Sequence, residues 1–320
     1  MDYLPRRLGA ALTSAARSFP ALIVTGPRQT GKTTLLRAVF GSGHRYVSLD
    51  APDVRAAARQ DPRRFLADHA PPVVIDEVQY VPELLAYAKE MIDADRRPGR
   101  RIFAGSQRFA LMKGVVESLA GRVAVFELDP LSVAEALGRG AERRTPSDWL
   151  RATFAGKTAS EFEAPRRAET FDTGDWLLRG GYPEPRTDAD MDMNVWFRSY
   201  LGTYVERDVR SVLNVGDLEA FLRFATLTAS RTAQLINYSS LASEVGVTAP
   251  TVKAWLSVLV ATGLVYLLRP YHRSLGKRLI KSPKLYWMDT GLAAHLMGIR
   301  DAESLVRGPA YGALFETAVV

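Results

Sequence analysis

Eight consecutive residues, Gly26 to Thr33, match the pattern G-x-x-x-x-G-K-[ST], in which x is any residue. The glycines let the backbone curl so that its N–H groups point toward phosphate, and a following helix N-terminus adds partial positive charge. Lys32 is placed to reach the β and γ phosphates of a nucleotide, and the Thr33 hydroxyl to coordinate Mg²⁺. A glycine turn without function is the alternative, but an apolar run precedes this pattern and a helical run follows it. We call residues 26–33 the phosphate loop and predict that phosphate is bound by Gly26, Pro27, Arg28, Gln29, Thr30, Gly31, Lys32, Thr33 and Thr34.

Two carboxylates follow the apolar run 72–75 and supply the next chemical group. Asp76, at the tip of a strand, is suited to hold Mg²⁺ through its carboxylate oxygens. Glu77 is placed to polarise an attacking water as a general base. An acidic pair after a strand is also an ordinary helix start, because acids favour the first helical turn. The phosphate loop upstream favours the metal and base roles.

A polar strand end and two arginines complete the set of candidate catalytic residues. Ser106 and Gln107 follow the run 101–104, where either side chain could orient water or contact the γ-phosphate, or simply form a turn. Arg207 and Arg122 are candidates to neutralise charge that develops on the γ-phosphate. Arg122 is predicted to lie on the nucleotide side of the sheet, although a salt bridge for Arg207 and a plain surface position for Arg122 remain alternatives. An arginine supplied by a neighbouring copy would require a homo-oligomer.

The elements that must position these residues follow an alternating pattern. Short apolar runs predict strands over 21–25, 46–49, 73–75, 101–104 and 123–127, and amphipathic stretches predict helices over 32–40, 52–69, 82–94 and 109–119. Strands that are apolar throughout are typical of a parallel sheet buried on both faces. The sequence therefore predicts an α/β fold with a five-stranded parallel sheet flanked by helices.

The remainder of the chain divides into further units. We predict an α/β core over 1–135, a helical extension over 136–232 that is broken at 180–183, a winged helix over 233–300 and a short last segment over 301–320. In the third unit, Ser239 is expected to cap a helix ending at Val245, and Thr248 a second helix ending at Val260, before a strand over 264–269. Trp255 and Trp287 are expected to lie in the core.

Composition excludes several other classes. The 320 residues are 47% hydrophobic and 24% charged, which argues against disorder, and the absence of cysteine excludes disulfides and thiol chemistry. No apolar run approaches the roughly 20 residues of a membrane span, so a cytoplasmic protein is expected. The net charge of +7 favours polyanionic partners. Segment 269–284 could track the phosphates of double-stranded DNA through Arg269, His272, Arg273, Lys277, Arg278, Lys281 and Lys284.

Taken in order, these motifs resemble a family of prokaryotic AAA-type P-loop ATP-binding proteins. The resemblance covers nearly the whole chain and rests on the phosphate loop and on segments 46–50, 75–79, 105–107, 119–122, 180–184 and 204–208. It implies an ATPase core with an extra strand between the phosphate-loop strand and the acidic strand. It also implies a winged helix and a C-terminal restriction-nuclease-like domain. Residues 315–320 resemble only the first helix of that last domain, so nuclease activity is not expected of this chain.

The expected function is Mg²⁺-dependent ATP binding and hydrolysis, coupled to a winged helix that binds DNA or a protein. The main alternative is a slow or non-hydrolysing nucleotide-dependent switch, similar to STAND-type signalling proteins or a DNA-binding regulator. A transcription factor with a degenerate nucleotide site is disfavoured, because every residue that the chemistry needs is present. Adenine specificity rests on the resemblance alone, and the segment around Arg6 and Arg7 could lie near the base.

Overall fold

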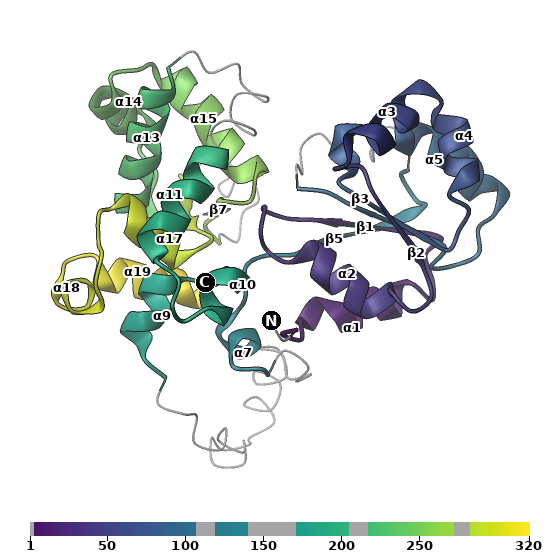
Figure 1. Cartoon of the computed structure of the whole chain (residues 1–320). Coiled ribbons are helices and arrows are strands. Elements are labelled where there is room, and N and C mark those ends of the chain that lie inside the picture. The colour runs from purple at the N-terminus through teal and green to yellow at the C-terminus, as the bar shows by residue number, and fades with distance from the viewer. Residues whose placement is uncertain (1–2, 107–118, 140–170, 205–216, 272–281) are drawn as a thin grey trace.

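A five-stranded parallel sheet forms the centre of the first part of the molecule (Figure 1). The computed structural model describes residues 3–106, 119–139, 171–204, 217–271 and 282–320. The strands lie in the order β2-β3-β4-β1-β5, so β4 separates the strand before the phosphate loop from the strand that ends in Asp76, as the family resemblance implied. The predicted strands are confirmed, with bounds β1 Ala21–Thr25, β2 Arg45–Ser48, β3 Val73–Asp76, β4 Arg101–Ala104 and β5 Val123–Glu127.

Helices cover both faces of this sheet, because its strands turn apolar side chains to each side. Along β1, Leu22 and Val24 pack in one hydrophobic cluster with α1 (Arg7–Ala15) and α2 (Lys32–Phe40). Ala21 and Ile23 pack in another with α3 (Pro52–Gln60), α4 (Pro62–Asp68) and α5 (Leu84–Ala94). The first part is therefore a three-layered α/β/α unit (Figure 1).

The single helix predicted over 52–69 is wrong, because the chain forms two helices there. Asp61 leaves the helical conformation, with φ −143° and ψ 87°, and its side chain accepts a hydrogen bond from Arg64 N–H at the start of α4. Pro62 then occupies the first turn of α4, where a missing N–H costs nothing. The predicted helix 109–119 lies almost entirely outside the described residues.

The second part is mainly helical and has one continuous core. Its largest hydrophobic cluster joins buried residues from Trp176 to Leu314 and includes Trp255 and Trp287, as predicted. It contains an antiparallel sheet in the order β6-β8-β7. The elements are α7 Val133–Ala136, α9 Thr173–Arg179, α10 Pro183–Thr187, α11 Met193–Tyr204, α13 Leu218–Ser230, β6 Gln234–Leu235, α14 Tyr238–Val245, α15 Ala249–Ala261, β7 Val265–Leu268, β8 Lys284–Trp287, α17 Thr290–Leu296, α18 Ala302–Arg307 and α19 Tyr311–Val319.

Helices α14 and α15 follow the predicted pair with one change. Thr248 caps α15, as predicted, by accepting a hydrogen bond from Thr251 N–H. The cap of α14 is Asn237 and not Ser239, because the Asn237 side chain accepts from Ser240 N–H at 3.0 Å. The strand β7 then begins at Val265, close to the predicted position.

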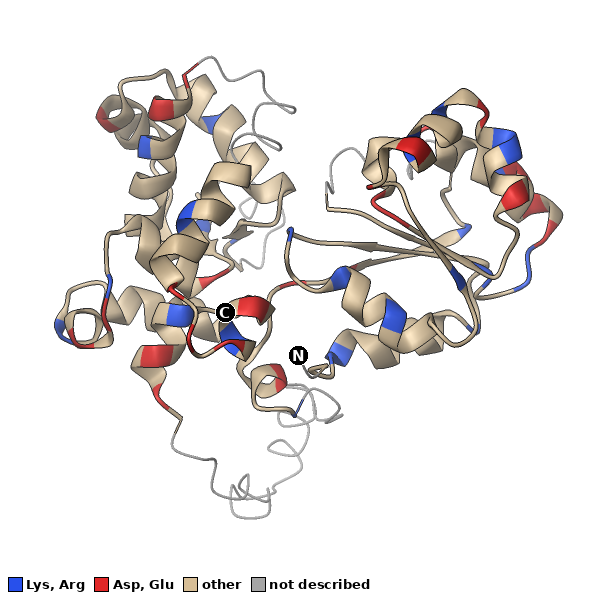
Figure 2. Cartoon of the chain, viewed as in Figure 1, with Lys and Arg blue, Asp and Glu red and all other residues tan. Residues whose placement is uncertain are grey.

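Charged residues of both signs are interspersed along the helices of both parts (Figure 2). The net charge therefore does not by itself single out a polyanion-binding face. Among the described residues, no helix has the length and apolar character needed to cross a membrane.

Candidate functional site

The phosphate loop joins β1 to α2 and adopts the backbone that its glycines allow. Gly26 has φ +142° and Gly31 has φ +88°, conformations that a side chain would strain. A Cβ at Gly26 would also lie 2.2 Å from the Leu128 carbonyl oxygen. Lys32 begins α2 and is buried, and its ammonium donates to the carbonyl oxygens of Gly26 (2.9 Å) and Pro27 (2.6 Å). The lysine is thus held inside the loop that it is predicted to serve.

Asp76 lies beside the loop and gathers three donors. The Thr33 hydroxyl donates to Asp76 Oδ2 at 2.6 Å, the Tyr46 hydroxyl donates to the same oxygen, and the Glu77 N–H donates to Oδ1 at 2.8 Å. Thr33 and Asp76, which the sequence separately predicted to hold Mg²⁺, are therefore in direct contact. Hydroxyl and carboxylate oxygens are ligands that Mg²⁺ prefers, and Mg²⁺ is commonly held by one or two such side chains together with substrate phosphates. The two residues fit that cation.

Tyr46 was not identified from the sequence. It lies on β2, next to β3 in the sheet, and the guanidinium of Arg37 lies 4.5 Å from the centre of its ring. Burial and the hydrogen bond to Asp76 raise the pKa of the Tyr46 hydroxyl, which therefore remains a donor. The available signal was its place in the segment 46–50, which the resemblance marked without assigning it a role.

Glu77 has an unusual backbone conformation and lines a cavity at the phosphate loop. Its φ of +57° is left-handed, a conformation that costs about 1–3 kcal/mol in a residue other than glycine. Burial raises the pKa of its carboxyl, while the hydrogen bond from Gln79 and the charge of Lys32 act to lower it. A cavity of about 370 Å³ is lined by Glu77 together with Arg28, Gln29, Gly31, Lys32, Thr33, Tyr200 and Thr203, and we call it the phosphate cavity.

Ser106 lies at the end of β4 and contacts Glu77 through an intermediary. Gln79 Nε2 donates to Ser106 Oγ at 3.1 Å and also to the Glu77 carboxylate, and Ser106 N–H donates to Gln79 Oε1 at 3.2 Å. Gln107, the other candidate at this strand end, lies outside the described residues. Gln79 was missed by sequence reasoning, although it ends the segment 75–79.

The prediction that Arg122 lies on the nucleotide side is wrong. Val123 pairs with Ala21 at the start of β1, whereas the phosphate loop follows Thr25 at the opposite end of that strand. Arg122 instead makes two hydrogen bonds to the Asp93 carboxylate, at 2.7 and 3.0 Å. Arg207, the other candidate, lies outside the described residues.

The second part of the chain supplies walls to the site. Tyr200 and Thr203 of α11 line the phosphate cavity, and the Tyr200 hydroxyl accepts from that of Tyr182 at 2.8 Å. A further cavity of about 360 Å³, which we call the side cavity, shares Gln29 and Gly31 with the phosphate cavity. Its other lining residues are Tyr3, Leu4, Arg6, Thr34, Leu131, Pro183, Glu184 and Thr187.

Arg6 belongs to the segment that the sequence suggested could lie near the nucleotide base, and it lies beside the phosphate loop. Its guanidinium donates to the carbonyl oxygens of Thr30 (2.8 Å) and Asp129 (2.6 Å), and its Nε lies 3.2 Å from a carboxylate oxygen of Glu135. These bonds tie the N-terminal segment to the loop and to the chain after β5. Arg6 therefore builds the wall of the side cavity.

The double glycine of the segment 180–184 joins the two parts. Gly181 O accepts from Leu131 N–H at 2.6 Å, and Gly181 N–H donates to the buried Asp289 at 2.6 Å. A Cβ would lie 2.2 Å from Asp289 Oδ1 at Gly180 and 2.3 Å from the Leu131 carbonyl oxygen at Gly181. Only glycine fits both positions, and the turn leads directly into Pro183 and Glu184 of the side cavity.

The turn after α15 contacts the phosphate loop itself. A Cβ at Gly263 would lie 2.9 Å from Cγ of Pro27, so the backbone of Gly263 passes close to that ring. The neighbouring Thr262 shares a hydrogen bond of 3.0 Å with the Tyr204 hydroxyl on α11. The loop, α11 and the α15–β7 turn are therefore in one contact network.

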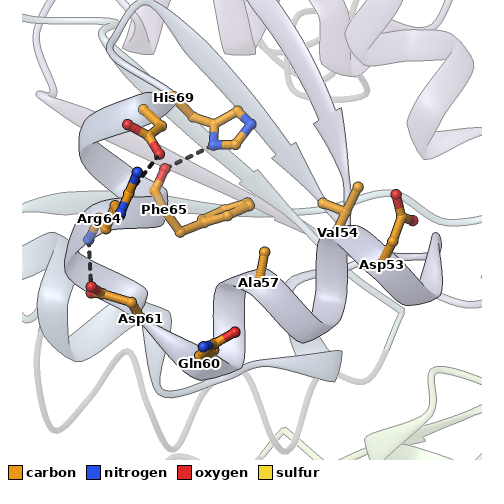
Figure 3. A pocket seen from close by; sticks show the side chains of 9 residues that line it. Asp53, Val54, Ala57, Gln60, Asp61, Arg64, Phe65 and His69 are labelled. Carbon is orange, nitrogen blue, oxygen red and sulfur yellow. Dashed lines mark hydrogen bonds and ion pairs between the residues drawn. The ribbon is translucent and has the colours of Figure 1, made fainter.

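A separate groove of about 480 Å³ lies on the outside of the first part, at α3 and α4 (Figure 3). Its side chains are mixed in charge, with Arg64 near Asp68 at 3.6 Å and the His69 ring 2.7 Å from the Phe65 carbonyl oxygen. The groove is lined by Asp53, Val54, Ala57, Gln60, Asp61, Arg64, Phe65, Asp68 and His69, which it does not share with the phosphate cavity.

The strand order and the phosphate loop place the molecule in the class of P-loop NTPase folds. Within that class, residues 18–137 match the family model described as an AAA domain, and this part of the chain is an AAA-type P-loop domain. Residues 170–303 match a second family model, described as a domain of unknown function, DUF8612.

The chain is also similar to two curated proteins and to a solved structure. Two curated proteins, Rv2008c of Mycobacterium tuberculosis and Mb2031c of Mycobacterium bovis, are each 33% identical to this chain over 318 residues. The match covers 98% of this chain but only 64% of each relative. Among solved structures, the Walker-type ATPase paby2304 of Pyrococcus abyssi has a TM-score of 0.54 at 16% identity, covering 92% of this chain and 99% of that one. That likeness supports the fold.

Proposed function

We propose that the protein is a Mg²⁺-dependent ATPase whose nucleotide state is coupled to the unit of α14, α15 and the β6-β8-β7 sheet. The observation that carries the proposal is the convergence of the predicted groups on one cavity. Lys32, Thr33 and Glu77 line the phosphate cavity, and Thr33 is bonded to Asp76 at 2.6 Å. These are the groups that phosphate binding, metal binding and water activation each require.

Each residue has a role that follows from its chemistry. Lys32 and the N–H groups of the phosphate loop bind the phosphates, and Thr33 and Asp76 hold Mg²⁺. When bound, the metal would neutralise charge on the phosphates. Glu77 accepts a proton from the attacking water, because its carboxylate lines the same cavity as Lys32 and Thr33.

The side cavity is the place we assign to the base and ribose. It opens beside Gly31 and Thr34 of the loop and is walled by Leu4, Leu131 and Pro183. Apolar walls with a few polar groups are typical of ligand cavities, and its volume of about 360 Å³ falls within their common range. The AAA domain match favours ATP as the nucleotide.

Coupling to the second part follows the contacts of the site. Helix α11 lines the phosphate cavity through Tyr200 and Thr203, and Tyr204 of that helix is bonded to Thr262. The adjoining Gly263 contacts Pro27 in the loop. A shift of the loop on nucleotide binding would therefore displace the residues at the C-terminal end of α15.

We propose that α14, α15 and the following strands form a winged helix that binds duplex DNA. Helix α15 exposes Lys253 and Ser257 on its surface, and Arg269 is exposed just after β7. Lys284 is less suited than the sequence suggested, because its ammonium is paired with Glu316. The other basic residues of 269–284, at positions 272–281, lie outside the described residues. If the same surface binds a protein instead, duplex DNA will have no effect.

The test is phosphate release from ATP with Mg²⁺, with and without duplex DNA at low salt. Glu77→Gln should abolish turnover while ATP binding persists, and Lys32→Ala should abolish binding. Glu90→Gln is the matched control and should behave as wild type, because Glu90 is an exposed residue of α5 that is paired with Arg63 of α4. Tight ATP binding without turnover in the wild type would favour a nucleotide-dependent switch. Absence of ATP binding would refute both readings.

A further inference from the structure

Gln79 is a buried polar residue whose amide group is not needed for the packing around it. It belongs to the short 3₁₀ turn Val78–Tyr80 that follows Glu77, and the residue is only 7% exposed. Val78 and Val81, on either side of it, are fully buried in the hydrophobic cluster under this turn. They provide the apolar packing, so the amide of Gln79 is available for another role.

Every hydrogen-bonding group of that amide except one lone pair has a partner. Nε2 donates to the Glu77 carboxylate and to Ser106 Oγ, and Oε1 accepts from Ser106 N–H. The orientation is determined by chemistry, because an ionised carboxylate can only accept a hydrogen bond. Gln79 thus connects the end of β3 with the end of β4, two neighbouring strands of the sheet.

The contact fixes the orientation of the Glu77 carboxylate. Glu77 Oε2 is bonded to Gln79, and Glu77 lines the phosphate cavity, where the proposed function places the attacking water. A carboxylate accepts on both oxygens, and a hydrogen bond to one of them restricts the rotation of the whole group. The left-handed φ of +57° at Glu77 indicates that surrounding contacts impose this conformation.

We propose that Gln79 is a positioning residue that links Ser106 to Glu77 and orients the Glu77 carboxylate for water activation. The proposal rests on the ATPase function proposed above. It assigns Ser106 an indirect role: the serine holds Gln79, and Gln79 holds the base. Small errors in the placement of a reacting group can reduce turnover by about 10²-fold, so the contact has a measurable consequence.

The experiment compares Gln79→Met, Ser106→Ala and the double variant in turnover, affinity for a non-hydrolysable ATP analogue, and melting temperature. Methionine keeps the length of glutamine and removes its hydrogen bonds. We expect kcat to fall about 10²-fold for Gln79→Met, with analogue affinity within about twofold of wild type. The double variant should be no slower than Gln79→Met, because both changes break one connection. Gln60→Met, an exposed glutamine in the groove of Figure 3, is the matched control.

Several outcomes would overturn the proposal. Losses that multiply in the double variant would show that Ser106 and Gln79 act separately, and an unchanged or increased kcat for Gln79→Met would show that the contact does not serve turnover. If Gln79→Met does not fold, Ser106→Thr decides: it keeps the hydroxyl and should retain turnover that Ser106→Ala loses. Absence of turnover in the wild type would refute the ATPase function itself, whereas an active wild type with an active Gln79→Met variant would refute this proposal alone.

Discussion

Substitution of Gly263 by alanine tests whether the α15–β7 turn and the phosphate loop act together. Gly263 has φ +74°, and an added Cβ would lie 2.9 Å from Pro27 Cγ and 3.1 Å from Pro27 Cδ. Carbon atoms in ordinary contact are about 3.5–4.0 Å apart, so the two segments must separate by about half an ångström or more. The Pro27 carbonyl accepts bonds from Lys32 and Thr30, and moving it disturbs the loop.

The free-energy cost expected for Gly263→Ala has two contributions. Alanine in the left-handed conformation costs about 1–2 kcal/mol. Overpacking against Pro27 costs a further amount of about 1–3 kcal/mol. If about 1.4 kcal/mol of the second contribution acts on the loop, affinity for ATP falls about tenfold. Gly263→Ala is therefore expected to lower both the free energy of unfolding and the affinity for ATP.

Gly246→Ala separates these contributions. Gly246 ends α14 with φ +83°, and its added Cβ would meet nothing within 4 Å. Gly246→Ala should carry only the conformational cost, so its free energy of unfolding should fall by about 1–2 kcal/mol. It should bind ATP as the wild type does. Denaturant unfolding and calorimetric titration with a non-hydrolysable ATP analogue measure both quantities. Equal affinity in the two variants would refute coupling through Pro27 and Gly263.

Three further changes address the walls and supports of the site. Tyr46→Phe removes a donor to Asp76 and should raise the Mg²⁺ concentration needed for nucleotide binding about tenfold, measured by Mg²⁺ titration, without changing metal-free affinity. Arg6→Met should cost about 3–5 kcal/mol in denaturant unfolding, because it leaves Glu135 buried without its cation, and adding Glu135→Gln should restore part of this. Burial raises the pKa of Asp289 to about 6 from 3.8, so its contribution to stability is complete below pH 3.8 and is lost as pH rises through 6. Stability relative to Asp289→Asn should thus increase by about 1 kcal/mol from pH 7 to pH 5.

The sheet was predictable because its strands are buried on both faces. Burial on both sides requires continuous apolar runs, and all five strands were found within one residue of their predicted bounds. The phosphate loop was equally clear, because its glycines are required by local backbone conformation. Both features are determined by residues that are close together in the sequence, so a local pattern predicts them.

The supporting contacts could not be predicted in the same way. Tyr46 bonds to a carboxylate 30 positions away, and Gln79 to a serine 27 positions away. Which polar residue meets which partner depends on strand order and register, and these emerge only when the sheet has formed. The motifs contained both residues, but no local pattern distinguishes a supporting polar side chain from an exposed one.

Two of the wrong predictions could have been avoided, because the sequence contains the signals that correct them. Arg122 precedes its strand, and in a parallel sheet such a residue lies at the edge opposite to a loop that follows a strand, such as the one after Thr25. The pair Asp61 and Pro62 is a helix stop followed by a helix start, which divides the stretch over 52–69. Both corrections follow from chain direction and capping alone.

Because both cavities take walls from both parts, nucleotide binding is expected to stabilise the second part as well as the loop. A ligand present at 100 times its Kd stabilises the state that binds it by about 2.7 kcal/mol. If the contacts of α11 and of Gly263 are part of that state, amide hydrogen exchange should slow at Tyr200 to Tyr204 and at Thr262 and Gly263, as well as in α2. Lys32→Ala, which should not bind ATP, is the control and should show no change. Protection confined to β1, the phosphate loop and α2 would mean that the second part does not sense the nucleotide.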